Sequence, residues 1–235
     1  MNKKASSSGK IKPPTARELL DYYTAEQLRA HFLGLGLGIR SVGFQPKPLN
    51  PAASEKDSDP VLKEGNLLSN VFNRAVRSCF YTVQKYNDGK IPVREISKQV
   101  LEDANNTILE YERLMYEYNF HLVMNLMDTY IRNINKFWSK NIKEAEDNND
   151  DDLRMQVLAD AFHMVRTAAV LMHPIAPEGT EMIREYLRLG EEFWSWERIF
   201  EPVYSFMENP EEHRLKFLEP RVDFFKKHPS QINKQ

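Results

Sequence analysis

The segment Val61–Tyr86 reads VLKEGNLLSNVFNRAVRSCFYTVQKY, and its pattern decides the fold class. Apolar residues recur in it every three or four positions, the spacing of an α-helix that buries one face. This apolar stripe consists of Leu68, Val71, Phe72, Ala75, Cys79 and Val83. Because a single helix gains little stability until such a stripe packs against a neighbour, the segment predicts a bundle of helices.

The rest of the chain shows the same helical spacing and no sustained alternation typical of strands. We expect one helix to open at Pro92 and run to Met115, and another to cover about 120–143. A further helix carries apolar residues from Leu153 to Met172, and a shorter one follows the turn at 173–177 and covers about 178–189. The fold class predicted is therefore all-α, an antiparallel helix bundle joined by short turns.

The first sixty residues predict a separate helical piece. Thr15 and Glu18 form a capping box at the start of one helix, and Thr24 begins a second that ends in the glycines of 34–38. Prolines and then charged residues follow, which resist regular structure. We divide the chain into residues 1–43, an irregular linker 44–60, the bundle 61–189 and a C-terminal extension 190–235 that packs on the bundle and ends in a polar tail.

Composition limits the possible functions. The chain has 32 basic and 34 acidic residues, a formal charge of −2, so any nucleic-acid binding must come from a local face. Its single cysteine, Cys79, cannot form an internal disulfide, which favours a reducing, cytoplasmic location. No apolar run approaches the ~20 residues that cross a bilayer, and no Cys/His cluster has the spacing of zinc ligands. We expect no membrane span and no metal site.

Two polar faces offer candidate binding residues. Asn70 and Arg74 lie one helical turn apart, opposite the apolar stripe, and Asn66, Asn73 and Arg77 share their face. An amide and a planar guanidinium together suit the edges and phosphates of unpaired nucleotides. By itself, however, such a face is more often only a solvated surface.

The helix over 120–143 carries Asn135, Lys136 and Trp138. We place Trp138 away from the apolar stripe formed by Leu126, Tyr130 and Ile134. An exposed indole there could stack on a nucleobase. The alternative, which is favoured by the residue type alone, is that Trp138 packs against a neighbouring helix.

Four stretches occur in the order found in methionyl-tRNA synthetases, which are class I aminoacyl-tRNA synthetases. Residues 4–9, KASSSG, resemble the KMSKS loop through Lys4, Ser6, Ser7 and Ser8. Residues 67–74, LLSNVFNR, are similar to a stretch on the first helix of the anticodon-binding domain. Residues 173–177, HPIAP, resemble the family's H-P-I-x-P turn, and residues 217–223, FLEPRVD, its late LFPR-type ending.

The resemblance covers nearly the whole chain and implies a function. It implies the C-terminal region of a tRNA ligase used in protein biosynthesis, with an anticodon-binding bundle after a stem-contact-type piece, and tRNA, suspected to be methionine-specific, as partner. In the family, the Asn and Arg of the first-helix stretch contact anticodon bases, and they correspond here to Asn70 and Arg74. We add Asn73, Arg77, Asn135, Lys136 and Trp138 as candidate contacts in the same region.

The sequence also departs from the family. The second Lys of the KMSKS loop is replaced by Ser7, or by Ser6 in the other register, and the family's x-P-W triplet reads Ile142-Lys143-Glu144. Without a nucleotide-binding Rossmann half, the chain alone is expected to hold no cofactor and to form no methionyl adenylate. ATP and Mg²⁺ are implied only for a complete enzyme, with its catalytic domain removed or on a separate chain. Two alternatives stay open: a degenerate paralogue whose bundle binds protein, and a plain helical scaffold.

Overall fold

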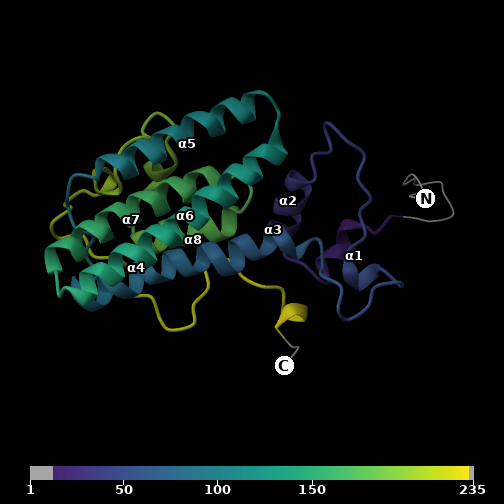
Figure 1. The fold of residues 1–235 in the computed structure, drawn as a ribbon, viewed down its shortest axis with the longest axis horizontal. Helices are drawn as coiled ribbons and strands as arrows, with labels where there is room; N and C mark the ends of the chain where they lie inside the picture. The colour runs from purple at the N-terminus through teal and green to yellow at the C-terminus, as the bar shows by residue number, and fades with distance from the viewer. Residues whose placement is uncertain (1–12, 233–235) are drawn as a thin grey trace.

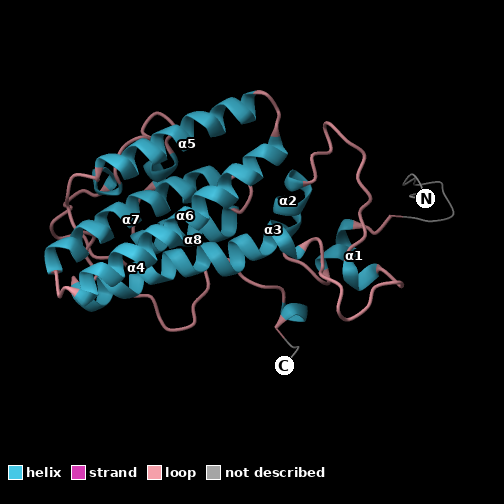
Figure 2. Ribbon diagram, in the orientation of Figure 1, coloured by secondary structure: helices cyan, strands magenta, loops and turns pink. Residues whose placement is uncertain are grey.

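The computed structural model describes residues 13–232, and these form helices and loops without a β-strand (Figures 1 and 2). The all-α prediction is therefore confirmed. The helices are α1 (Ala16–Leu20), α2 (Ala25–Gly34), α3 (Leu62–Asn66), the π-helical segment η2 (Leu67–Phe72), α4 (Asn73–Tyr86), α5 (Lys98–Tyr116), α6 (Phe120–Asp147), α7 (Asp151–Met172) and α8 (Pro177–Leu187). Short 3₁₀ turns are η1 (Lys47–Leu49), η3 (Glu191–Trp194), η4 (Val203–Phe206) and η5 (Pro229–Gln231).

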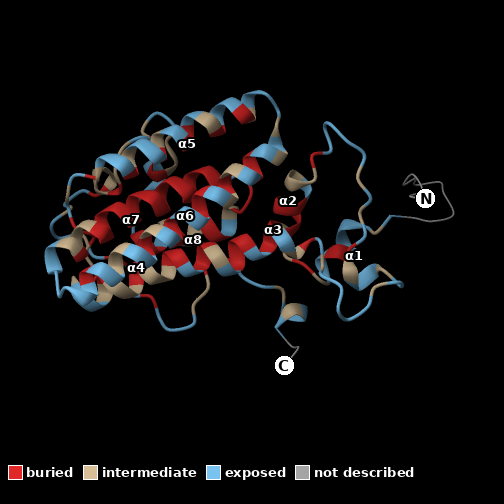
Figure 3. Cartoon of the chain, viewed as in Figure 1, coloured by how far each residue is buried: buried red, intermediate tan, exposed pale blue. Residues whose placement is uncertain are grey.

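Helix α7 lies at the centre of the bundle (Figure 3). Every residue from Val157 to Met172 is buried, so the helix is covered on all sides rather than along one stripe. Its start is exposed, and there the Asp150 carboxylate caps the helix by accepting a hydrogen bond from the backbone N–H of Leu153 at 2.9 Å. Helices α4, α5, α6 and α8 pack around this central helix.

Helix α5 begins at Lys98, so the expected start at Pro92 is wrong. Ser97 precedes the helix, and both its backbone N–H and its hydroxyl donate hydrogen bonds to the Asp160 carboxylate of α7, at 2.8 and 2.6 Å. These bonds fix the first turn of α5 against the central helix, and residues 90–97 cross to it without helical structure. The partner that sets this boundary lies more than sixty residues away in the sequence.

The N-terminal helices pack around a small core of their own. The predicted capping box of Thr15 and Glu18 is confirmed, and α2 begins after Thr24 as expected, with a second capping box between Thr24 and Gln27. The small core consists of Leu19, Tyr23, Leu28 and Val61. Helix α2 also touches the bundle, where the Glu26 carboxylate accepts a hydrogen bond from the Gly179 N–H at 2.9 Å.

The C-terminal segment after α8 is held on the bundle by a buried guanidinium. Arg166 of α7 donates to the backbone carbonyls of Ile199, Glu201 and Arg198, at 2.7, 3.0 and 3.2 Å. Burial lowers the pKa of Arg166 to about 10, and these carbonyls supply the polar contacts that a buried charge requires. Within residues 13–232, no helix is both long enough and apolar enough to cross a membrane.

The buried imidazole of His163 predicts a pH dependence of stability. Burial, assisted by the nearby positive charge of Arg166, lowers its pKa to about 4 from 6.5, so the folded state keeps this ring neutral. The unfolded chain takes up the proton first as the pH falls below 6.5, and stability is then lost progressively toward pH 4. We expect the unfolding free energy of His163→Met to fall less over this range, by about 3 kcal/mol. Urea denaturation at several pH values measures the difference, and parallel curves for the two proteins would contradict it.

Candidate nucleic-acid interface

The first predicted helix of the bundle contains a π-helical turn at η2. The backbone N–H of Asn73 donates to the carbonyl of Leu68, five residues earlier, as well as to that of Asn70. A π-turn is wider than an α-turn, so it rotates the residues that follow it relative to regular α-helical spacing. Such turns frequently occur at functional sites, and this one carries Asn70.

Asn70 and Arg74 both lie exposed on the surface, as a binding role requires. The Asn70 Nδ2 donates to Asn66 Oδ1 at 2.9 Å, and the Arg74 Nε donates to Asn135 Oδ1 at 3.0 Å. Among residues 13–232, neither the Asn70 Oδ1 nor the two Nη groups of Arg74 has a hydrogen-bond partner. One acceptor and the outer donors of a guanidinium are therefore available to a ligand.

Asn73 does not face solvent, and its placement on the polar face is corrected. Its side chain is buried, donating to the Phe225 carbonyl at 2.9 Å and accepting from the Phe225 N–H at 3.0 Å. Asn73 lies one helical turn before Val76 and two turns before Phe80, which are both buried, so the buried face of α4 extends beyond the predicted stripe. Asn73 therefore holds residue 225 against α4, where the Phe225 ring stacks on Phe72 at 5.0 Å between centroids.

Asn135 is also buried rather than exposed, which corrects its role as a direct contact. Its Nδ2 donates to the backbone carbonyl of Val71 at 2.9 Å, while its Oδ1 accepts from Arg74. A side chain so placed orients the guanidinium of Arg74 instead of touching a ligand itself. Lys136, the next residue, is exposed on α6.

Trp138 belongs to the main core, so the expectation of an exposed indole is wrong. Its side chain is only 9% exposed. The buried stripe of α6 passes through Met127, Ile131 and Ile134, and Trp138 lies one helical turn after Ile134 on the same face. The indole therefore packs inside the bundle and presents no surface on which a nucleobase could stack.

A polar pocket of about 460 Å³, here called the α4 pocket, opens beside the exposed pair. It is lined by Ser69, Asn70, Asn73, Arg74, Arg77, Ser78, Tyr81, Asp223 and Lys227. Three cations and one carboxylate give it a formal charge of +2. Arg77 is half-buried in an ion pair with Asp223 at 2.9 Å, and the Tyr81 hydroxyl donates to the Glu219 carbonyl at 3.3 Å.

The sequence did not single out Tyr81, Asp223 or Lys227 as site residues. Asp223 ends the stretch FLEPRVD, so that motif could have identified it. Tyr81 and Lys227 carry no comparable signal, since they reach the pocket only through the packing of the C-terminal segment on α4. The residues Lys4, Ser6, Ser7 and Ser8 of the KMSKS-like loop lie outside the described residues.

The side chains that line the α4 pocket are suited to binding a polar ligand. It offers amides, hydroxyls and guanidinium groups, which recognise phosphates and base edges. Cys79 lies in the core and not in the pocket, and burial raises the pKa of its thiol far above the usual range. Among residues 13–232, no group of three or more His, Cys, Asp or Glu side chains could hold a metal ion.

Comparison with known protein families identifies the class of protein to which this fold belongs. The family model described as the anticodon-binding domain of tRNA ligases matches residues 97–223, which is more than half of the chain. The chain belongs to this family. The match runs from Ser97 to Asp223 and so includes α5 to α8 and, among the residues that line the α4 pocket, Asp223.

Individual relatives are mostly methionine–tRNA ligases. The enzyme of Pyrococcus furiosus is 26% identical over 225 residues, and the match covers 92% of this chain and 27% of that protein. The enzyme of Listeria monocytogenes is 28% identical over 210 residues, with 84% of this chain and 29% of that protein covered. An isoleucine–tRNA ligase of Picrophilus torridus is 23% identical over 219 residues, covering 87% of this chain and 20% of the relative. The chain thus spans less than a third of the length of these relatives.

Solved structures show the same fold. Mycobacterium tuberculosis methionyl-tRNA synthetase bound by methionyl-adenylate superposes with a TM-score of 0.68 and 19% identity, over 94% of this chain and 41% of that one. Its apo form gives a TM-score of 0.65 at 19% identity, over 89% of this chain and 40% of that one. The resemblance to the C-terminal region of methionyl-tRNA synthetases is confirmed.

The buried amide of Asn135 predicts a specific loss of stability. Asn135→Ala removes the donor to the Val71 carbonyl and the acceptor for Arg74, and we expect the unfolding free energy to fall by about 1–3 kcal/mol. Urea denaturation measures this change. The matched control is Asn133→Ala, an exposed amide on the same helix, with an expected change within about 0.5 kcal/mol. Equal losses in the two variants would show that Asn135 does not join the helices.

Proposed function

We propose that this chain is the anticodon-recognition region of a methionyl-tRNA synthetase and that its α4 pocket binds the anticodon loop of a methionine tRNA. The observation that carries the proposal is the exposed pair Asn70 and Arg74, which borders a pocket of charge +2 on a bundle of the anticodon-binding family. The predominance of methionine–tRNA ligases among the relatives supports the choice of tRNA.

Each polar group of the pocket has a role in this proposal. Arg74 and Asn70 read base edges, because a guanidinium offers a donor pair and the amide oxygen accepts. Lys227 contributes to the attraction of phosphates, while Arg77 is kept in place by its ion pair with Asp223. Asn135 acts as a positioning residue, since it touches Arg74 and lies buried beneath it.

Catalysis is assigned to a domain outside these residues. Because the chain spans 27–31% of the length of these methionine–tRNA ligases, we propose that it aminoacylates tRNA only together with a catalytic domain. We also propose that this takes place in the cytoplasm. ATP and Mg²⁺ would be bound by that domain.

Arg74→Ala tests the proposal. We expect it to weaken binding of methionine tRNA by about 1–3 kcal/mol, since a guanidinium that reads a base edge is lost. Binding of the unchanged protein should also weaken steeply as salt rises, because phosphate contacts release counterions. Fluorescence anisotropy of labelled tRNA at two salt concentrations measures both effects.

The control variant is Arg132→Ala on α6, which removes an exposed arginine paired with Asp128 at 2.8 Å and should bind tRNA as the unchanged protein does. A tRNA with a scrambled anticodon loop should bind less tightly than the methionine tRNA. Comparable affinity for the two tRNAs, or equal losses in the two variants, would remove the case for base recognition by Arg74.

A further inference from the structure

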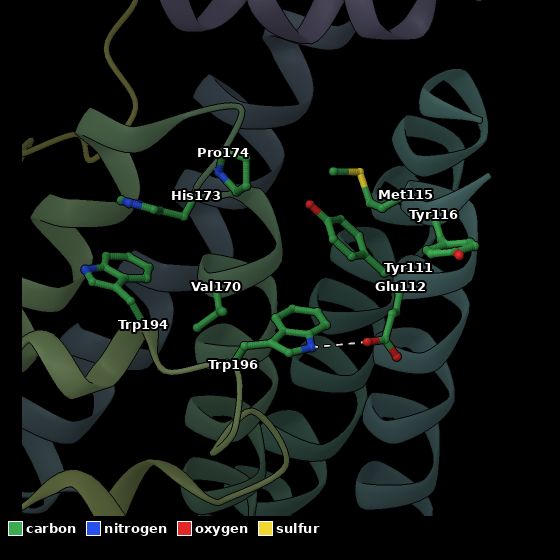
Figure 4. A pocket seen from close by; sticks show the side chains of 9 residues that line it. All are labelled: Tyr111, Glu112, Met115, Tyr116, Val170, His173, Pro174, Trp194 and Trp196. Carbon is green, nitrogen blue, oxygen red and sulfur yellow. Dashed lines mark hydrogen bonds between the residues drawn. The ribbon is translucent and has the colours of Figure 1, made fainter. Parts of the chain in front are cut away.

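A second pocket, of about 410 Å³, lies between α5, the turn that joins α7 to α8, and residues 194–196 at the end of η3 (Figure 4). We call it the aromatic pocket. It is lined by Tyr111, Glu112, Met115, Tyr116, Val170, His173, Pro174, Trp194 and Trp196. Helices α6 and α7 lie between α5 and α4, so this pocket and the α4 pocket belong to different sides of the bundle (Figure 1).

The aromatic side chains of this pocket are oriented by contacts of their own. The Trp196 indole N–H donates to the Glu112 carboxylate at 3.3 Å, and the Trp196 and Tyr111 rings lie 6.3 Å apart between centroids (Figure 4). Trp194 stacks on the His173 ring at 3.8 Å. Trp196 is nevertheless 42% exposed and Tyr116 87% exposed, so aromatic surface remains open to a ligand.

The charges around the aromatic pocket are negative. The two segments that carry its aromatic residues, 110–117 and 191–198, contain six acidic and two basic residues, a formal charge of −4. Four of the six carboxylates are ion-paired with arginines. Among residues 13–232, Glu112 and Glu197 have no ion-pair partner.

The pocket also lacks a positive charge of its own. No lysine or arginine lines the pocket, and burial lowers the pKa of His173, whose Nδ1 lies 2.9 Å from the Thr180 hydroxyl. The electron-rich faces of the aromatic rings attract a cation, and the Glu112 carboxylate adds to that attraction.

We propose that the aromatic pocket is a docking site for a basic segment of a partner protein, which lays an arginine side chain against the exposed rings of Trp196 and Tyr116. The guanidinium stacks on the rings, and the Glu112 carboxylate at the rim balances its charge. The methylene groups of the arginine cover the apolar wall formed by Met115, Val170 and Pro174. A nucleic acid is disfavoured at this surface, because the net charge of −4 repels phosphates.

The three tryptophans of the chain allow a direct test with the whole protein. The indole N–H signals of ¹⁵N-labelled protein are followed by NMR during titration with the blocked peptide acetyl-Gly-Ser-Arg-Ser-Gly-amide. We expect the signals of Trp196 and Trp194 to shift with increasing peptide. The signal of Trp138, which lies in the core, should stay unchanged and serves as an internal control.

A peptide with citrulline in place of arginine has nearly the same shape without the charge, and it should bind roughly tenfold more weakly. Trp196→Leu, followed through the Trp194 signal, and Glu112→Gln should each weaken arginine-peptide binding by a similar factor. Glu112→Gln keeps a side-chain oxygen as acceptor for the indole N–H. The matched control is Glu102→Gln, an exposed carboxylate on the same helix paired with Lys98, which should bind as the unchanged protein does.

Several results would overturn the proposal. Equal affinity for the arginine and citrulline peptides would show that charge has no role. Tighter binding of a leucine peptide would assign the pocket to an apolar side chain. Shifts of the Trp196 signal that grow with protein concentration alone would assign it to a second copy of the chain, and shifts caused by an RNA pentanucleotide would assign it to nucleic acid.

Discussion

The amide of Asn135 is the constraint on which the interface depends. It connects α6 to the π-turn through the Val71 carbonyl and, from its other side, fixes the Nε of Arg74. A long arginine side chain loses rotamer entropy when it binds, and a bond made before binding reduces that cost. The outer donors of Arg74 are thus directed outward by a residue that is itself buried.

The amide of Asn73 similarly positions the C-terminal residues that line the α4 pocket. Asn73 bonds both backbone groups of Phe225, so the C-terminal segment bearing Asp223 and Lys227 is fixed to α4. The same segment is fixed upstream by the guanidinium of Arg166, which contacts three backbone carbonyls. Polar side chains that the bundle buries therefore place residues from distant parts of the sequence in one pocket.

Local sequence was sufficient to predict the helices, their caps and the exposure of Asn70 and Arg74. Each of these features depends on residues within one or two helical turns. Local sequence was insufficient where the hydrogen-bond partner is remote in the chain, as for the burial of Asn73 and the start of α5. The π-turn left no recognisable pattern in the sequence. Trp138 was different, since its burial could have been predicted from the stripe that contains Ile134.

The small net charge of −2 conceals local charges of opposite sign. The α4 pocket carries +2, whereas the segments around the aromatic pocket carry −4, and α6 and α7 separate them. In the field of a polyanion such as tRNA, this separation favours approach by the α4 face and disfavours approach by the opposite one. A tRNA and a basic protein segment would therefore not compete for one surface, and a chain of nearly neutral composition can bind partners of opposite charge.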